Sequence, residues 1–305
     1  MSDHGGVAPQ AEAGPAERFG AETLPQPRNL LAQGPLAEAI ATGQARGLTV
    51  FQHINKTAGS SMVAELQRHP GNYMSLHNDY ERFRDPELDY ATLIPALRTE
   101  MHQVLDRALV AYQPDRVRCL SGHLYREHMD RLFALFPQAF FFTFLRAPVA
   151  RVISDFRYQC TPQHPPYLAF RRACPTIEHY LDREDETDKM YEMLVGRDVP
   201  LDEGIAHIER RYALVGIHEM YPMSFNILMR CHGRDSFPRA HLRPTADLPE
   251  NRVELTPALR ARIEARNPRD MALYRHFHAQ MLARRGEWQA LRAEGSRSAA
   301  RNEGP

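Results

Sequence analysis

The residues best suited to chemistry lie in one short stretch, FQHINKTAGSSM. A lysine there is followed by small and hydroxylated residues, namely Lys56, Thr57, Ala58, Gly59, Ser60 and Ser61. Small residues let the backbone approach an anion, and the N-terminus of a helix offers unpaired N–H groups and a partial positive charge. Lysine adds a full charge and the serines add hydroxyl donors. The stretch therefore predicts a phosphate or sulfate site.

This stretch is similar to the phosphate-binding loop G-x-x-x-x-G-K-[ST] of nucleotide-hydrolysing proteins, but the order of its residues differs. Lys56 precedes Gly59, and Thr57 is the one hydroxyl that directly follows the lysine. A standard ATP or GTP site is therefore not expected. A lysine beside an ordinary turn of small residues remains the structural alternative.

A second candidate anion site follows the apolar run 139–145 (AFFFTFL). Arg146 comes directly after that run, while Arg151 and Ser154 lie on the helix expected from Pro148. An arginine at the end of an apolar strand needs a partner. Arg146 and Ser154 could reach one anion together, whereas spacing alone favours a solvated helix charge for Arg151. A ligand with two separated anionic groups would fit both sites.

The elements that must position these residues alternate between strands and helices. Strands are expected at 48–54, 117–121, 139–145 and 212–217, and helices at 60–68, from 148, and at 224–230, 257–266 and 268–284. This alternation predicts a mainly parallel sheet with helices on both faces. Ligands of such sheets bind beyond the carboxyl ends of the strands, where both candidate loops lie.

Two segments, 70–115 and 155–200, show less regular patterns. They are interpreted either as substrate-binding loops or as surface elaboration. The chain ends have a different composition: 1–45 is rich in Ala, Gly, Pro and Glu, and 286–305 is polar. We therefore expect a disordered tail over 1–45, one domain over 46–285 and a polar C-terminal tail over 286–305.

Composition excludes several classes of protein. Lys plus Arg and Asp plus Glu are equal at 38 each, so nucleic acid is not an expected partner and any anion site must be local. The four cysteines form no CxxC pair, which argues against a zinc ribbon or a disulfide framework. No metal cluster is evident. No apolar run approaches the roughly 20 residues of a membrane span, and no secretory signal is seen, which predicts a cytoplasmic protein.

Taken together, these motifs resemble the sulfotransferases that use 3′-phosphoadenosine-5′-phosphosulfate (PAPS). The carbohydrate-type family, including the uronosyl 2-O-sulfotransferases and their bacterial relatives, is the most similar, over about 48–285. Segment 55–61 (NKTAGSS) resembles the loop for the 5′-phosphosulfate, and 145–154 (LRAPVARVIS) resembles the motif for the 3′-phosphate. Weaker similarity exists at 214–219 (LVGIHE) and at 241–245 (HLRPT), which resembles a loop that closes over the cofactor.

The resemblance implies a P-loop-NTPase-like three-layer α/β/α fold and a set of roles. Segment 56–61 would bind the 5′-phosphosulfate, Arg146 and Ser154 the 3′-phosphate, and Arg243 and Thr245 would belong to the closing loop. Asn55 stands where the family has proline, and Ala147 where it has an acidic residue. Neither position supplies the cofactor contact, so these departures would change loop stiffness and helix capping rather than exclude activity.

The chemistry implied is transfer of SO₃ from a phosphate oxygen to an acceptor hydroxyl, through a loose transition state in which positioning and charge stabilisation dominate. Lys56 is assigned to the leaving phosphate, and no metal is required. An acceptor hydroxyl needs a general base, and histidine is the usual choice. His123 follows a short strand and a glycine, and its Gly-His pair resembles the segment that carries the base in 2-O-sulfotransferases.

Other candidate bases are weaker. A histidine that only caps or packs the turn is the structural alternative for His123. His53 is expected within a strand and His128 exposed on the following helix, while Asp155 and Glu219 remain candidates because some sulfotransferases use a carboxylate.

Two other functions stay open: a nucleotide-dependent phosphoryl transferase, and a non-catalytic nucleotide-binding interaction module. The first needs a Mg²⁺-binding aspartate on a second strand, but the apolar strand ends in arginine. The acceptor is expected to be a carbohydrate or another small molecule, and the oligomeric state is not readable. Arg171, Arg172 and Arg183 are interpreted as solvated surface residues, with contact to an acidic acceptor as the alternative.

Overall fold

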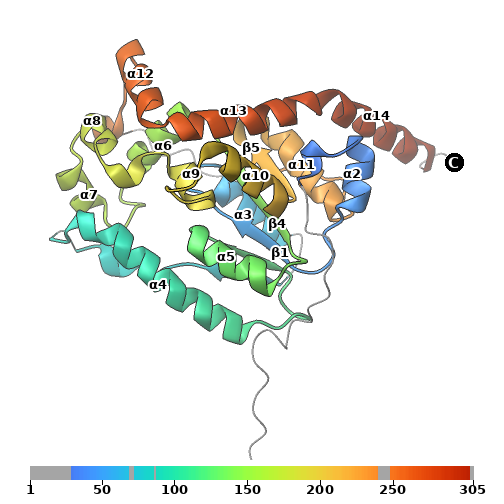
Figure 1. Ribbon diagram of the computed structural model, residues 1–305, viewed down its shortest axis with the longest axis horizontal. Helices are drawn as coiled ribbons and strands as arrows, with labels where there is room; N and C mark the ends of the chain where they lie inside the picture. Colours follow the sequence, from blue (N-terminus) through green and yellow to red (C-terminus); the bar gives the residue numbers. More distant parts are fainter. Residues whose placement is uncertain (1–28, 69–71, 86, 240–247, 303–305) are drawn as a thin grey trace, which may run out of the picture.

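The computed structural model describes residues 29–68, 72–85, 87–239 and 248–302. A five-stranded sheet forms its centre, with strands β1 (Thr49–Gln52), β2 (Tyr73–Leu76), β3 (Cys119–Gly122), β4 (Phe140–Leu145) and β5 (Leu214–Ile217). The strand order is β2-β3-β1-β4-β5, and every pairing is parallel. Helices pack on both faces (Figure 1), so the predicted three-layer P-loop-NTPase-like α/β/α fold is confirmed.

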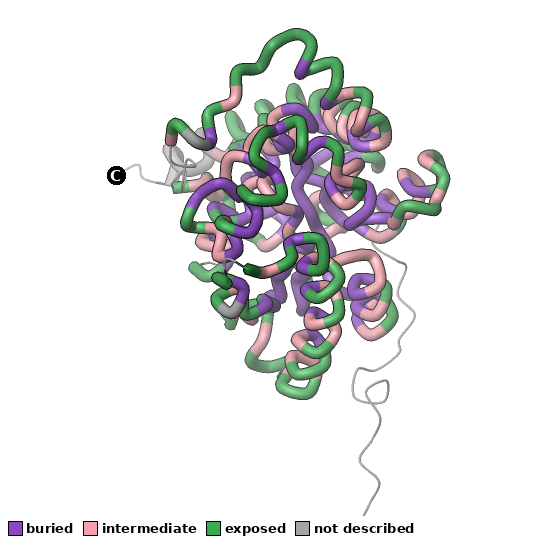
Figure 2. Tube along the Cα trace, turned by 90° about the vertical axis from the view of Figure 1, so that its left-hand side faces the viewer, coloured by how far each residue is buried: buried purple, intermediate pink, exposed green. Residues whose placement is uncertain are grey.

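The central strands are buried on both faces, as Figure 2 shows by the purple trace through the middle of the molecule. Every residue of β1, β3, β4 and β5 is buried. This explains why the apolar run of β4 does not alternate with polar residues, since both of its faces are covered by helices. At the carboxyl ends, Gln52 of β1 lies beside Gly122 of β3 and Thr143 of β4.

The strand order reverses direction between β1 and β4. The chain leaves β1 toward β2 on one side of the sheet order, and it leaves β4 toward β5 on the other. Open α/β sheets bind ligands where the strand order reverses, at the carboxyl ends of the two strands concerned. The two predicted anion loops follow β1 and β4, which are neighbours in the sheet, so the topology places both loops at this point.

The helices are as follows. The α-helices are α2 (Leu36–Thr42), α3 (Gly59–Arg68), α4 (Tyr90–Ala111), α5 (Arg126–Leu135), α6 (Pro148–Gln159), α7 (Tyr167–Ala173), α8 (Ile177–Leu181), α9 (Lys189–Leu194), α10 (Leu201–Arg211), α11 (Tyr221–Cys231), α12 (Pro257–Arg266), α13 (Pro268–Ala283) and α14 (Arg285–Asn302). Short 3₁₀ turns are η1 (Leu30–Ala32), η2 (Tyr80–Phe83), η3 (Glu184–Glu186), η4 (His218–Met220) and η5 (Pro249–Asn251).

The described residues of the two expected tails, 29–45 and 286–302, hold regular structure. The described part of the expected N-terminal tail, 29–45, contains η1 and α2, and Leu30, Leu31 and Leu36 are at most 3% exposed. These leucines find apolar cover on helices far along the chain, because α2 packs against α11 and α14. In the expected C-terminal tail, α14 places Trp288 Nε1 2.9 Å from Asn226 Oδ1. The domain limits themselves stay a prediction.

The two irregular segments also hold more structure than expected. Segment 70–115 contains β2 and the 22-residue helix α4, and 155–200 contains α7, α8 and α9. Helices α4 and α5 lie on the side of the sheet away from α13 and α14 (Figure 1). Among the described residues, no helix is long and apolar enough to cross a membrane.

Candidate active site

The loop between β1 and α3 has an unusual backbone. Lys56 and Ala58 have positive φ angles of 65° and 87°, although neither is glycine. Thr57 between them is buried, and its hydroxyl donates to the carbonyl oxygen of Ile54 at 2.9 Å. Left-handed residues of this kind are strained and concentrate at functional sites. The turn delivers the chain directly into α3, whose first-turn N–H groups belong to Gly59, Ser60 and Ser61.

Gly59 is required by packing against His53. A Cβ at position 59 would lie 1.4 Å from His53 Nε2, so any side chain there would displace the ring. The His53 ring also lies 4.1 Å from the ring of His123, centroid to centroid. Burial lowers the pKa of His53 well below its usual range, and the charges of His123, His77 and Lys56 act in the same direction. His53 is thus the neutral spacer between the lysine loop and His123.

Lys56 is half-buried and has no carboxylate within ion-pair distance among the described residues. Its ammonium lies over the ring of Tyr158, 4.2 Å from the centroid, which is a cation–π contact. Burial lowers the pKa of Lys56, Arg146 lowers it further, and Asp155 opposes the shift. A positive charge in this condition is more favourable with an external anion beside it.

Arg146 joins this lysine loop from the end of β4. Its Nη1 donates to the carbonyl oxygen of Lys56 at 3.1 Å, and its buried Nε has no hydrogen-bond partner among the described residues. Burial lowers the pKa of Arg146, the charge of Glu219 opposes this shift, and Arg151 acts in the same direction as burial. Arg146 and the lysine loop therefore lie side by side at the carboxyl ends of β4 and β1. Ser154 lies half-buried on α6, where no contact to Arg146 is recorded.

Glu219 explains how α6 begins without an acidic residue at position 147. The Ala147 N–H donates to Glu219 Oε1 at 3.0 Å, and the Tyr274 hydroxyl donates to Glu219 Oε2 at 3.1 Å. A carboxylate near a helix N-terminus is stabilising. Both oxygens of Glu219 are thus engaged structurally, which disfavours it as a general base.

His123 has the hydrogen bonding of a base. Its Nδ1 lies 2.8 Å from the carbonyl oxygen of His53. Because a carbonyl can only accept, Nδ1 carries the proton and Nε2 carries the lone pair. Burial lowers the pKa of His123 to about 4, and the nearby His77 contributes. The ring is therefore neutral at pH 7, with a fixed tautomer.

A pocket begins beside His123. Its lining comes from the lysine loop, from the residues after β2, from α4, from the start of α5 and from α9: Asn55, Asn78, Tyr80, Ile94, Leu97, Met101, His123, Tyr125, Lys189 and Met193. Asn55 and His123 belong to the two loops after β1 and β3. The pocket therefore connects the edge of the anion site with the candidate base.

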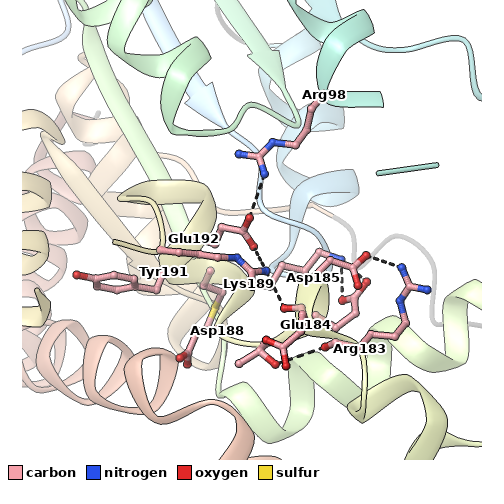
Figure 3. A network of polar contacts seen from close by, with 12 residues as sticks. Arg98, Arg183, Glu184, Asp185, Asp188, Lys189, Tyr191 and Glu192 are labelled. Carbon is pink, nitrogen blue, oxygen red and sulfur yellow. Dashed lines mark hydrogen bonds and ion pairs between the residues drawn. The ribbon is translucent and has the colours of Figure 1, made fainter. Parts of the chain in front are cut away.

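A buried charge cluster lies beneath the site and consists of Arg151, Asp155, Glu186 and Lys189. Asp155 Oδ2 is 3.2 Å from Arg151 Nη1 and 3.3 Å from Lys189 Nζ. Lys189 Nζ also lies 2.8 Å from Glu186 Oε2, among the acidic residues of 184–192 (Figure 3). The Tyr180 hydroxyl donates to Glu186 Oε2 at 2.6 Å and lies 3.2 Å from Asp155 Oδ2.

This cluster corrects two predictions. Arg151 is 0% exposed rather than solvated, because the chain folds carboxylates around it. Asp155 is not a suitable base, because the charges of Lys189 and Arg151 lower its pKa to about 2 despite burial. Lys189 was not recognised in the sequence, since its partners come from a segment without a regular pattern.

His128 also differs from its prediction, being fully buried on α5 rather than exposed. It lies with His102 and Glu127 in a group spaced for a metal ion. Its Nδ1 accepts from the Tyr125 N–H at 3.1 Å, so Nε2 carries the proton in the neutral ring. Glu127 already pairs with Arg98 at 3.1 Å. This donor set does not fit a cation.

The remaining predicted residues divide as follows. Arg243 and Thr245 lie outside the described residues. Arg171 and Arg172 are exposed, as expected, and Arg172 Nη2 donates to the carbonyl oxygen of Leu88 at 3.1 Å. Arg183 is instead largely buried, and it pairs with Asp185 at 2.5 Å. Contact of any of the three with an acceptor remains untested.

Comparisons with known proteins give limited similarity. No protein-family profile matches this chain, and no curated protein matches it. A solved structure that is similar is the crystal structure of a sulfotransferase from Alicyclobacillus acidocaldarius. It has 19% sequence identity and a TM-score of 0.41, over 75% of this chain and 94% of that chain.

Proposed function

We propose that this protein is a PAPS-dependent sulfotransferase that acts on an acceptor hydroxyl. One arrangement carries the proposal. Lys56 and Arg146 have no ion-pair partner among the described residues and lie at the carboxyl ends of β1 and β4, and a neutral histidine whose Nε2 carries the lone pair lies at the same edge. An anion-holding pair beside a base is what group transfer from a bisphosphorylated donor to a hydroxyl requires.

The donor fits the residues present. Within the described part of the chain, Arg146 Nε is a buried donor without a hydrogen-bond partner, and Lys56 is a half-buried charge without an ion-pair partner. In the proposal, Lys56 and the N–H groups and hydroxyls of 57–61 hold the 5′-phosphosulfate. Arg146 and Ser154 hold the 3′-phosphate, and Arg243 and Thr245 close over the nucleotide. These roles follow the sequence resemblance.

PAPS would supply the sulfuryl group. The group would pass to the acceptor oxygen with the 5′-phosphate as the leaving group, and His123 Nε2 would take the hydroxyl proton. Lys56 stabilises the charge that develops on the leaving phosphate, which is the type of interaction that contributes most to such transfers. The carbonyl oxygen of His53 holds the imidazole in place and stabilises the imidazolium that forms.

A phosphoryl transferase has less support. It needs an aspartate at the end of a second strand to hold Mg²⁺. Beyond β4 the chain supplies Arg146 instead, and the nearest aspartate on α6, Asp155, is already paired with two cations.

The proposal is tested by thermal unfolding with 3′-phosphoadenosine-5′-phosphate (PAP), the desulfated product, without magnesium. Ligand at about 100 times its dissociation constant should add roughly 2.7 kcal/mol to the free energy of unfolding. We expect stabilisation of the wild type, loss of it in Arg146→Ala, and retention in Arg172→Ala, whose guanidinium is exposed and remote from the loop.

Parallel samples with ATP and magnesium distinguish the alternatives. Stabilisation by ATP and magnesium alone would favour the phosphoryl transferase. Stabilisation by PAP together with no sulfate transfer to any acceptor, and no effect of His123→Ala, would favour the interaction module.

A further inference from the structure

The pocket beside His123 lacks an unpaired charged side chain that would bind an acidic sugar. Among its ten lining residues there is no arginine, aspartate or glutamate. We infer that it is the acceptor subsite, and that its acceptor is a compact, uncharged alcohol or phenol with a second hydrogen-bond donor. The inference rests on the proposed function, because it assigns the substrate class of the same site.

One side of the pocket is apolar. Ile94, Leu97 and Met101 lie at i, i+3 and i+7 on α4 and present one face of that helix, while Met193 of α9 completes the wall. Leu97, Met101 and Met193 are at most 8% exposed. A carbohydrate would bury hydroxyl groups against this wall without partners, which is unfavourable. A hydrocarbon or aromatic body would not.

The charge of the pocket is also compensated. Lys189 is the lysine of the lining, but its ammonium is held by Glu186 at 2.8 Å and Asp155 at 3.3 Å. It is therefore not free to attract the carboxylate of an acidic sugar. The phenols of Tyr80 and Tyr125 stay protonated, since burial raises both pKa values, that of Tyr125 to about 12.

Asn78 identifies the second polar group of the acceptor. It lies just after β2 and is 8% exposed, and its Nδ2 donates to the carbonyl oxygen of Leu97 at 3.0 Å. That bond fixes the orientation of the amide, because a carbonyl needs a donor. Asn78 Oδ1 is then a buried acceptor without a partner among the described residues. Buried polar atoms need a partner, so the ligand should donate an O–H or N–H to it.

The size of the pocket agrees with a compact acceptor. The cavity volume is about 40 Å³. This is room for about three waters and lies well below the roughly 150 Å³ of a cavity that holds benzene, so a ring enters only where the wall adapts. The two methionines can adapt to its shape, since their side chains are flexible.

The test compares phenol with the three dihydroxybenzenes (catechol, resorcinol and hydroquinone) as acceptors. We expect at least one dihydroxybenzene to exceed phenol about tenfold in kcat/KM, which is what one additional hydrogen bond gives. In Asn78→Ala this ratio should fall to about two, the value set by two equivalent hydroxyls. The matched control is Asn72→Ala, an exposed asparagine just before β2, which should keep the wild-type ratio.

Two further acceptors, glucuronate and methyl glucoside, test the charged and neutral sugar classes. Either sugar exceeding phenol in kcat/KM would overturn the inference, as would an unchanged ratio in Asn78→Ala. A direct titration of the same probes into the protein, without PAPS, separates the two proposals. If PAP does not stabilise the protein but the dihydroxybenzenes still bind more tightly than phenol and the sugars, the sulfotransferase proposal is rejected. If PAP stabilises the protein but all probes bind equally, the assigned acceptor is rejected.

Discussion

Two lysines of the candidate site, Lys189 and Lys56, lie in opposite electrostatic environments. Lys189 is buried between Asp155 and Glu186, and these carboxylates raise its pKa despite the cost of burial. Lys56 is half-buried on the ring of Tyr158, and burial lowers its pKa. Lys189 has two ion-pair partners, whereas Lys56 has none among the described residues and is acted on by Asp155 only from a distance.

The difference indicates which charge serves a ligand. A compensated lysine is part of the scaffold, and removing it leaves buried carboxylates unpaired. A partly buried lysine without an ion-pair partner, in a strained loop, lowers the stability of the fold. Features of this kind are typical of functional sites. Lys189 therefore shapes the pocket, while Lys56 is available to an anion.

The largest effect should come from removing the compensated lysine. Lys189→Met leaves Asp155 and Glu186 buried without their cation, and we expect a loss of about 3–5 kcal/mol in the free energy of unfolding. Urea denaturation measures it. Lys56→Met is the matched control and should change stability little. Equal losses in the two variants would break the comparison.

Activity should respond in the opposite sense. Lys56→Met removes the cation assigned to the leaving phosphate, and kcat should fall by about 10²- to 10³-fold, the typical cost of losing one such donor. Sulfate transfer to the best phenolic acceptor is measured, with circular dichroism to show that the fold is kept. A variant with wild-type kcat would remove Lys56 from the chemistry.

The pH dependence of kcat/KM should sharpen the contrast further. His123 must be neutral to accept a proton, so activity is lost as pH falls through its pKa of about 4 and is present above it. Lys56 must be protonated, so activity is lost as pH rises, at a pH below the usual lysine pKa of 10.5. A bell-shaped profile is expected, and Lys56→Met should lose its alkaline limb. An acid limb near 6.5 would contradict the environment described for His123.

The smallest effect concerns the start of α6. Glu219→Gln removes the negative charge that accepts from the Ala147 N–H, and we expect a loss of about 0.3–1 kcal/mol in the free energy of unfolding. Thermal and urea unfolding both measure it. A loss of activity as large as that of His123→Ala, with stability kept, would instead make Glu219 the base.

Much of the sheet was predictable, because its signals are local. The apolar runs at β1, β4 and β5 and the proline at the start of α6 mark elements whose interiors are buried on both faces. The edge strand β2 was missed. Ser75 is exposed, Tyr73 and Met74 are partly buried and Leu76 is buried, so the strand has no continuous apolar run.

The site was predictable in part for the same reason. The lysine loop and Arg146 follow strong strands, so their positions at one edge follow from parallel pairing. Asn78, Tyr158 and Lys189 carry no comparable signal. Each belongs to the candidate site only through the folded structure. Asn78 has a buried amide oxygen without a partner among the described residues, the ring of Tyr158 lies under the Lys56 ammonium, and Lys189 lies between two carboxylates.

The sequence by itself determined the fold class, and it indicated the two candidate anion loops and the candidate histidine, since hydrophobic periodicity and residue type act over short distances along the chain. Tertiary structure alone decided which charges are free. The sequence does not show whether a given lysine, arginine or aspartate is solvated, paired with another residue or able to bind a ligand. Their state depends on burial and on partners from distant segments, because the cost of an unpaired charge appears only where water is excluded.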